Sequence, residues 1–115
     1  MREIELEELV RRRGELVLVD VRSPEEFDGS LGAPCDPRQG HIPGALNLPL
    51  EVLLQGGDED LRGWLAAPDG AEIVVYCHSG SRSGIAVGVL ERLGYEGRNY
   101  RGSWHEWART ELPLE

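Results

Sequence analysis

The chain has few cysteines and no long hydrophobic run, and both shortages exclude classes of protein. Two cysteines, Cys35 and Cys77, occur in 115 residues, which is too few for the disulfide framework of a small secreted domain. No apolar stretch approaches the ~20 residues of a membrane-spanning helix. The acidic N-terminal residues 1–8 also lack the apolar core of a signal peptide. We therefore expect a cytoplasmic protein, in a reducing compartment, that has no membrane partner.

Basic residues are scarce as well. The sequence has 12 basic against 21 acidic residues and a formal net charge of −9. Binding to a nucleic-acid backbone relies on a basic surface, so we expect no nucleic-acid partner. The same negative field repels an anionic substrate, and the local field of any anion site has to overcome it. With no internal repeat and no linker, the length indicates one domain, residues 1–115.

One stretch in the middle of the chain carries the strongest chemical signal. Residues 73–76 form a short β-prone run that predicts a buried strand, and Cys77 follows it directly. A glycine- and serine-rich loop comes next, and the apolar density of residues 85–93 predicts a mostly buried helix with Ser81 or Ser83 as its N-cap. A cysteine in this position faces amides that converge toward a helix N-terminus. The arrangement predicts an anion pocket with a nucleophile at its base.

Cys77 is either a reactive thiol or a small buried hydrophobic residue, and the pKa of its thiol distinguishes the two. We favour the reactive thiol, because the loop amides, and secondly Arg82, should lower the pKa of Cys77. We expect the planar guanidinium of Arg82 to tie the loop together through outward-facing carbonyl groups, a role that a lysine could not fill. The second cysteine, Cys35, is interpreted as an incidental surface residue, with a sulfur-accepting role as the alternative.

Strand and helix patterns alternate along the rest of the chain. Ser23 and Pro24 carry a helix-start signature, with a glutamate three residues after the cap. Further strands are predicted at 16–19, 46–48 and 98–100, and helical segments at 5–13, around 53–54 and 61–65, and from Ser103 onward. The alternation predicts an α/β fold with a central, mostly parallel sheet flanked by helices on both faces.

Four segments together resemble the rhodanese family. The first, 77–82, is a cysteine separated by four residues from an arginine. The other three occur in the family's order, at 20–27, 40–49 and 100–107. The glycine- and proline-rich loop 28–39 is longer than single-domain rhodaneses usually have. In this loop and in its C-terminal segment, the chain resembles the catalytic C-terminal half of two-domain thiosulfate and mercaptopyruvate sulfurtransferases. It resembles that half as a separate, single-domain protein.

The resemblance implies a thiosulfate sulfurtransferase that works through a persulfide on Cys77, with no cofactor and no metal. The donor would be a small sulfur-containing anion, and the acceptor a small thiol, cyanide or a protein thiol. Loop residues would bind the substrate, namely His78, Ser79, Gly80, Ser81, Arg82 and Ser83. Three other residues would give structural support, namely Asp20, Arg22 and His41; we expect the ring of His41 to hydrogen-bond the backbone rather than act as a base.

Several alternatives share the motif. Phosphatase or arsenate reductase chemistry is disfavoured, because rhodanese-like phosphatases have one more residue in the loop. A non-catalytic binding domain would usually lose the cysteine, and this chain keeps it. A persulfide carrier for a sulfur-trafficking pathway has the same chemistry and stays open. Thiosulfate is favoured over mercaptopyruvate as donor, because Arg82 adds positive charge to the loop.

Overall fold

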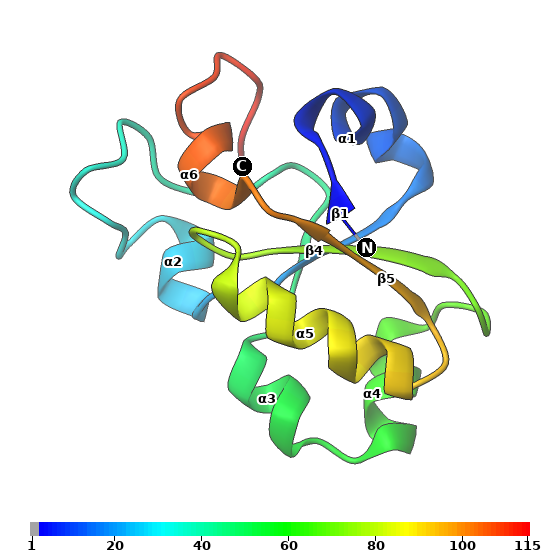
Figure 1. The fold of residues 1–115 in the computed structure, drawn as a ribbon. Coiled ribbons are helices and arrows are strands. Elements are labelled where there is room, and N and C mark those ends of the chain that lie inside the picture. The colour runs from blue at the N-terminus through cyan, green and yellow to red at the C-terminus, as the bar shows by residue number, and fades with distance from the viewer. Residues whose placement is uncertain (1–2) are drawn as a thin grey trace.

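A sheet of five parallel strands forms the centre of the fold (Figure 1). The computed structural model describes residues 3–115, so the first two residues of the predicted domain lie outside the described part. The strands stand in the order β1-β5-β4-β2-β3. Their bounds are β1 Glu3–Ile4, β2 Val17–Asp20, β3 Leu46–Asn47, β4 Glu72–Tyr76 and β5 Glu96–Tyr100. The predicted α/β fold is confirmed, and the sheet is parallel throughout.

Helices cover both faces of this sheet, as predicted (Figure 1). On one side lie α3 (Leu50–Gln55), α4 (Asp58–Leu65) and α5 (Ser81–Arg92), and on the other lie α1 (Leu6–Arg12) and α6 (Ser103–Trp107). A 3-10 turn, η1 (Arg13–Glu15), and a short helix, α2 (Pro24–Asp28), complete the elements. Among residues 3–115, no helix has both the length and the apolar character needed to cross a bilayer.

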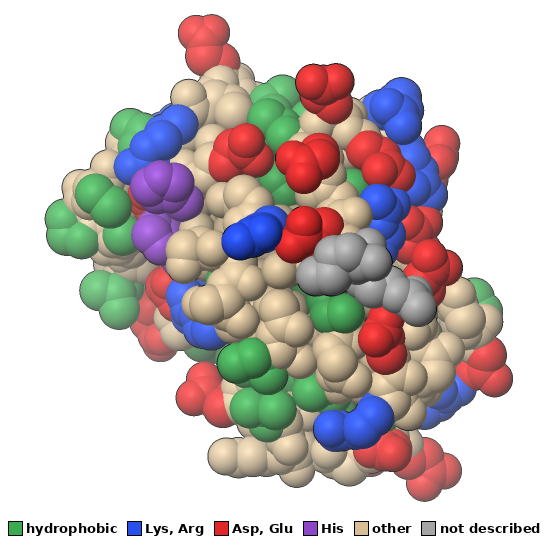
Figure 2. All heavy atoms as spheres, viewed as in Figure 1, with side chains coloured by type: hydrophobic (Ala, Val, Ile, Leu, Met, Phe, Trp, Pro, Cys, Tyr) green, Lys and Arg blue, Asp and Glu red, His purple; other side chains and the backbone are tan. Residues whose placement is uncertain are grey.

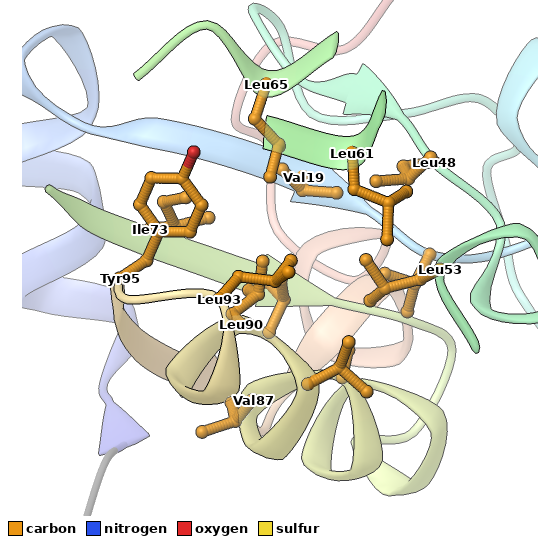
Figure 3. Packing of buried hydrophobic residues seen from close by; sticks show 14 of the residues in the cluster. Val19, Leu48, Leu53, Leu61, Leu65, Ile73, Val87, Leu90, Leu93 and Tyr95 are labelled. Atoms are coloured by element: carbon orange, nitrogen blue, oxygen red, sulfur yellow. The ribbon is translucent and has the colours of Figure 1, made fainter. Parts of the chain in front are cut away.

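Two hydrophobic cores follow from the alternation of side chains along the strands. Ile73 and Val75 of β4 face the side of α3, α4 and α5, whereas Val74 and Tyr76 face α1 and α6. Figure 3 shows side chains from the three helices of the first core converging on the sheet. All four of these β4 residues have no exposed surface, which explains why β4 is a continuous apolar run in the sequence.

Helix α6 closes the second core with two indole rings. Trp104 and Trp107 are completely buried and anchor the packing of this core. Each indole N–H donates to a backbone carbonyl, from Trp104 to Arg38 at 3.1 Å and from Trp107 to Pro113 at 2.9 Å. The first of these bonds holds the loop 28–39 beside α6.

The N-terminal helix expected over 5–13 is confirmed as α1, Leu6–Arg12, followed by the 3-10 turn η1. Strand β1, in which Ile4 pairs with Tyr100, was not predicted. One local prediction was wrong. The N-cap of α5 is Gly80 rather than Ser81 or Ser83, and no side chain caps it. By contrast, the predicted start of α2 is confirmed, with Ser23 and Glu26 forming a capping box.

Candidate active site

Cys77 lies at the carboxyl end of β4, where the chain turns into α5, and its side chain is buried. Two backbone N–H groups point at its sulfur. The amide of Gly80 lies 3.1 Å from Sγ and the amide of Ser83 lies 3.5 Å from it. Because these amides belong to the unpaired first turn of α5, they offer an anion at this position hydrogen bonds as well as the positive end of the helix dipole.

The left-handed conformation of Gly80 makes this convergence possible. Its φ is +95°, a region that residues with a Cβ rarely adopt. A Cβ built there would lie 2.7 Å from the carbonyl oxygen of Arg101. Gly80 is therefore required both for the turn and for the close approach of the Arg101 backbone.

The hydroxyl of Ser83 is a third donor to the sulfur. Its Oγ lies 3.4 Å from Cys77 Sγ and 2.7 Å from Oδ1 of Asn99 on β5. The side-chain nitrogen Nδ2 of Asn99 donates to the Gly80 carbonyl at 3.1 Å, which turns Oδ1 of the same side chain toward Ser83. A hydroxyl has one proton to give, so Ser83 bonds either Asn99 or the sulfur, and a charged sulfur is the stronger acceptor.

These donors make the thiol acidic. Burial by itself would raise the pKa of Cys77, but hydrogen bonds from the Ser83 hydroxyl and from the amides of Ser83, Gly80 and Ser79 outweigh it. The net result is that the pKa of the Cys77 thiol is lowered from its ordinary value. This confirms the predicted direction and the role of the amides, and it adds the Ser83 hydroxyl as the largest stabilising contact.

Ser103 fixes the other side of Cys77. It is buried, and its φ of +55° is unusual for a residue with a side chain. Its Oγ accepts the backbone N–H of Cys77 at 3.1 Å and donates to the Tyr100 carbonyl at 2.9 Å. The Cys77 carbonyl in turn accepts the amide of Trp104 at 2.9 Å. The backbone of Cys77 is therefore bound to the start of α6.

Arg82 does not tie the loop together through its carbonyls as predicted. Its guanidinium pairs with Glu26 of α2 at 2.9 and 3.2 Å, and the side chain is 38% exposed. Burial alone would raise the pKa of Glu26, but Arg82 and the Ser23 amide lower it to about 2. The hydrogen bond that Arg82 donates to Glu26 raises the pKa of Arg82, and the charge of Cys77 also raises it. Among the groups that mainly set the thiol pKa of Cys77, Arg82 does not figure.

The three residues expected to give structural support contact groups other than the sulfur. Asp20 and Arg22 form a buried pair, with Arg22 Nη2 at 2.8 Å from Asp20 Oδ2 and 2.6 Å from the Gly40 carbonyl. The guanidinium of Arg22 also lies over the ring of Trp104, 5.1 Å from its centre. His41 Nδ1 lies 2.8 Å from the Phe27 carbonyl, so its ring contacts the backbone, as expected. The supporting role of all three stays a prediction.

The remaining loop residues differ in how far their side chains are exposed to solvent. Ser79 and Ser81 are exposed, and Ser79 contributes its amide to the thiolate field. His78 is half-buried, and its Nε2 lies 2.9 Å from Oδ2 of Asp36, in the long loop 28–39. Arg109 bonds the other oxygen of Asp36 at 2.8 Å. Figure 2 shows histidine and arginine side chains side by side at the left edge of the molecule.

Sequence reasoning missed four residues of this region: Ser103, Asn99, Asp36 and Glu26. The pairing of Val75 with Asn99 in neighbouring parallel strands could have drawn attention to Asn99, since both strands end at the same edge. No local pattern marks the contacts of Asp36 with His78 or of Glu26 with Arg82, because they join segments 42 and 56 residues apart.

Among residues 3–115, one set of three side chains has donor atoms close enough to share a metal ion. These are the Sγ of Cys35, a carboxylate oxygen of Asp36 and a ring nitrogen of His78, all within 4.8 Å of one another. The set includes His78, the residue after Cys77, but not Cys77 itself.

Comparisons with known proteins agree on one family. The profile of the rhodanese-like domain matches residues 4–110. A crystal structure described as a probable thiosulfate sulfurtransferase is 48% identical, with a TM-score of 0.87, and the match covers 98% of this chain and 47% of that one. A human single-domain sulfurtransferase is 33% identical, with a TM-score of 0.72, and the match covers 97% of this chain and 99% of that one.

Curated proteins give the same result at comparable identity. A Haloferax volcanii protein, provisionally named a thiosulfate sulfurtransferase, is 44% identical over an alignment of 108 positions, and the match covers 80% of this chain and 37% of that protein. A Mycolicibacterium smegmatis protein with the same provisional name is 39% identical over an alignment of 117 positions, and the match covers 88% of this chain and 42% of that protein. The chain thus spans about two fifths of the length of these curated relatives.

Proposed function

This chain belongs to the family of rhodanese-like domains, and from that premise we propose that it is a sulfurtransferase. It moves a sulfane sulfur from thiosulfate, or a related small anion, to a thiophilic acceptor. The observation that carries the proposal is the convergence of the Gly80 and Ser83 amides and the Ser83 hydroxyl on Cys77 Sγ. The relatives named above as thiosulfate sulfurtransferases favour thiosulfate as donor.

The first half-reaction forms a persulfide. The Cys77 thiolate attacks the outer sulfur of thiosulfate, an S–S bond forms, and the S–S bond of the donor breaks. Sulfite leaves with the electron pair of that bond, and the outer sulfur remains on Cys77. The thiolate is available for this attack because the pKa of the Cys77 thiol is lowered. No base is required at this step.

The second half-reaction releases the sulfur. An acceptor thiolate, or cyanide, attacks the outer sulfur of the persulfide, and Cys77 leaves as the thiolate with the bonding pair. The persulfide is an anion, and the amides that hold the thiolate are preorganised to hold it as well. Their dipoles are fixed by the left-handed Gly80 and by the bond from Asn99 to the Gly80 carbonyl. A covalent intermediate of this kind predicts ping-pong kinetics.

Intact-mass measurement tests the proposal directly. After incubation with thiosulfate and removal of small molecules, the protein should gain one sulfur, about 32 Da, through its nucleophile. Cys77→Ser should abolish the gain, whereas the matched Cys35→Ser variant should keep it. Loss of the gain in Cys35→Ser, with retention in Cys77→Ser, would overturn the assignment of the nucleophile.

Donor choice is tested by kcat/KM for thiosulfate, mercaptopyruvate and glutathione persulfide, with cyanide and then a thiol as acceptor. We expect thiosulfate to be the best of the three donors. A mass gain with glutathione persulfide alone would overturn thiosulfate as donor. No gain with any of the three would overturn sulfur transfer itself.

A further inference from the structure

The loop 28–39 places a second group of reactive side chains against the residue that follows the nucleophile. Cys35 and Asp36 come from this loop and His78 from the turn before α5, and their donor atoms lie within 4.8 Å of one another. In a tetrahedral zinc site with bonds of 2.0–2.3 Å, neighbouring donor atoms are roughly 3.5 Å apart. Shifts of about an ångström would therefore bring these three atoms to bonding distance of one ion.

The carboxylate of Asp36 is held as a metal-ligating carboxylate usually is. Its side chain is completely buried, and Arg109 donates to Oδ1 at 2.8 Å, so that Oδ2 is the oxygen that faces His78. Ligating carboxylates are commonly fixed by such an outer hydrogen bond. Arg109 also donates to the Cys35 carbonyl at 3.0 Å, which fixes the backbone of the cysteine beside the acid.

A fourth ligand and an entry path are both present. His105 lies at the rim of the group, with Nδ1 at 3.7 Å from Asp36 Oδ1 and its ring edge-on to that of His78. Cys35 is exposed, and the side chains of His78 and His105 are 27% and 52% exposed. A cation can therefore reach the group from solvent while Asp36 anchors it from the buried side.

We propose that Cys35, Asp36 and His78 bind a zinc-class divalent cation, with His105 or a water as the fourth ligand. Thiolate sulfur, imidazole nitrogen and carboxylate oxygen together are the donor set that favours Zn²⁺ over Mg²⁺ or Ca²⁺. Binding releases the Cys35 thiol proton and leaves His78 neutral, with Nε2 as ligand. The two negative ligands balance the two charges of the ion. This site departs from the sequence-based expectation of no metal, and it does not rest on the proposed sulfur transfer.

The experiment uses the complete chain carrying Cys77→Ser, kept reduced, so that the nucleophile cannot bind the metal. Co²⁺ is titrated as a spectroscopic probe and Zn²⁺ by calorimetry. We expect one equivalent of metal and a thiolate-to-cobalt charge-transfer absorption. Adding Cys35→Ser should abolish that absorption and weaken the Kd for Zn²⁺ at least tenfold, and His78→Gln should weaken it similarly.

The matched control is His41→Gln, which removes a histidine whose Nδ1 contacts the Phe27 carbonyl and which belongs to none of these contacts. Its metal affinity should stay unchanged. Because Cys35 is exposed, its serine variant should keep the native circular dichroism spectrum, so loss of binding there cannot be ascribed to unfolding. Unchanged Zn²⁺ affinity in the Cys35→Ser background, or no cobalt absorption at millimolar metal, would overturn the site. Either result leaves the persulfide mass test unaffected.

Discussion

Ser83→Ala is the substitution that best isolates the source of the thiol's acidity. The variant removes the hydroxyl 3.4 Å from Cys77 Sγ but keeps the Ser83 amide, which lies 3.5 Å from the same sulfur. Ser83 is buried within α5, and alanine is tolerated in a helix and smaller than serine, so the backbone of the turn has no reason to move. The change therefore separates the hydroxyl contribution from the amide contribution.

The expected size follows from hydrogen-bond energetics. Hydrogen bonds to charged groups contribute roughly 1.5–3 kcal/mol, which corresponds to about 1–2 pKa units at 1.36 kcal/mol per unit. Asn99 Oδ1, at 2.7 Å, competes for the same proton, so we take the lower end of that range. Ser83→Ala should therefore raise the pKa of Cys77, with a loss of about 1.5 kcal/mol of thiolate stabilisation.

The assay is the alkylation rate of Cys77 against pH, measured in a Cys35→Ser background so that one thiol reacts. Only the thiolate reacts, so the inflection reports its pKa. Below the inflection, the variant should react up to about tenfold more slowly than the parent. Ser81→Ala, at an exposed position of the same helical turn, is the matched control and should leave the inflection in place. Thermal unfolding of both variants checks that the fold is intact.

If Ser83→Ala leaves the inflection where it is, the hydroxyl contributes nothing and the amides alone set the acidity. If Ser81→Ala moves it as far as Ser83→Ala does, the effect comes from the helix start and not from the contact with sulfur. Either result would refute the reasoning that places the Ser83 hydroxyl first among the stabilising contacts.

Two further predictions concern the frame of the site. Gly80→Ala would force a Cβ to 2.7 Å from the Arg101 carbonyl oxygen at a φ of +95°. We therefore expect at least a tenfold loss in kcat/KM for thiosulfate and a lower Tm. Wild-type kinetics would show that the turn tolerates a side chain. The lowered pKa of Glu26, about 2 against an ordinary 4.5, means that its pair with Arg82 stabilises the fold above pH 4.5 and loses that contribution as the pH falls toward 2. Glu26→Gln should make urea stability less sensitive to pH over this window, and an unchanged acid slope would contradict the assignment.

Much of the fold could be predicted because its signals are local. The apolar run 73–76 is buried on both faces of the sheet, which is why it appears unbroken in the sequence. The capping box of Ser23 and Glu26 is closed within four residues, so its pattern is legible without tertiary information. Cys77 could be identified for the same reason, since strand, loop and helix are adjacent in the chain.

What could not be predicted depends on pairing between distant segments. Strand β1 has two residues, too few for a periodic pattern, and it forms because Ile4 pairs with Tyr100. Ser83 suits an N-cap by composition, but the left-handed Gly80 starts the helix first and turns the serine toward the sulfur. The buried position of Asp36 is set by His78 and Arg109, from two other parts of the chain.

Arg82 shows how a correct motif can carry a wrong physical role. The sequence predicts that its guanidinium ties the loop together and that its charge helps to lower the pKa of Cys77. In the structure, that charge is largely offset by Glu26 at 2.9 Å. The sulfur is instead contacted by neutral donors, among them the Gly80 and Ser83 amides and the Ser83 hydroxyl. Such dipoles act over a few ångströms at a buried site, where salt has little effect, whereas exposed charges more than about a Debye length away are largely screened. An anionic nucleophile is therefore compatible with a strongly acidic chain, because its stabilisation does not depend on the overall field.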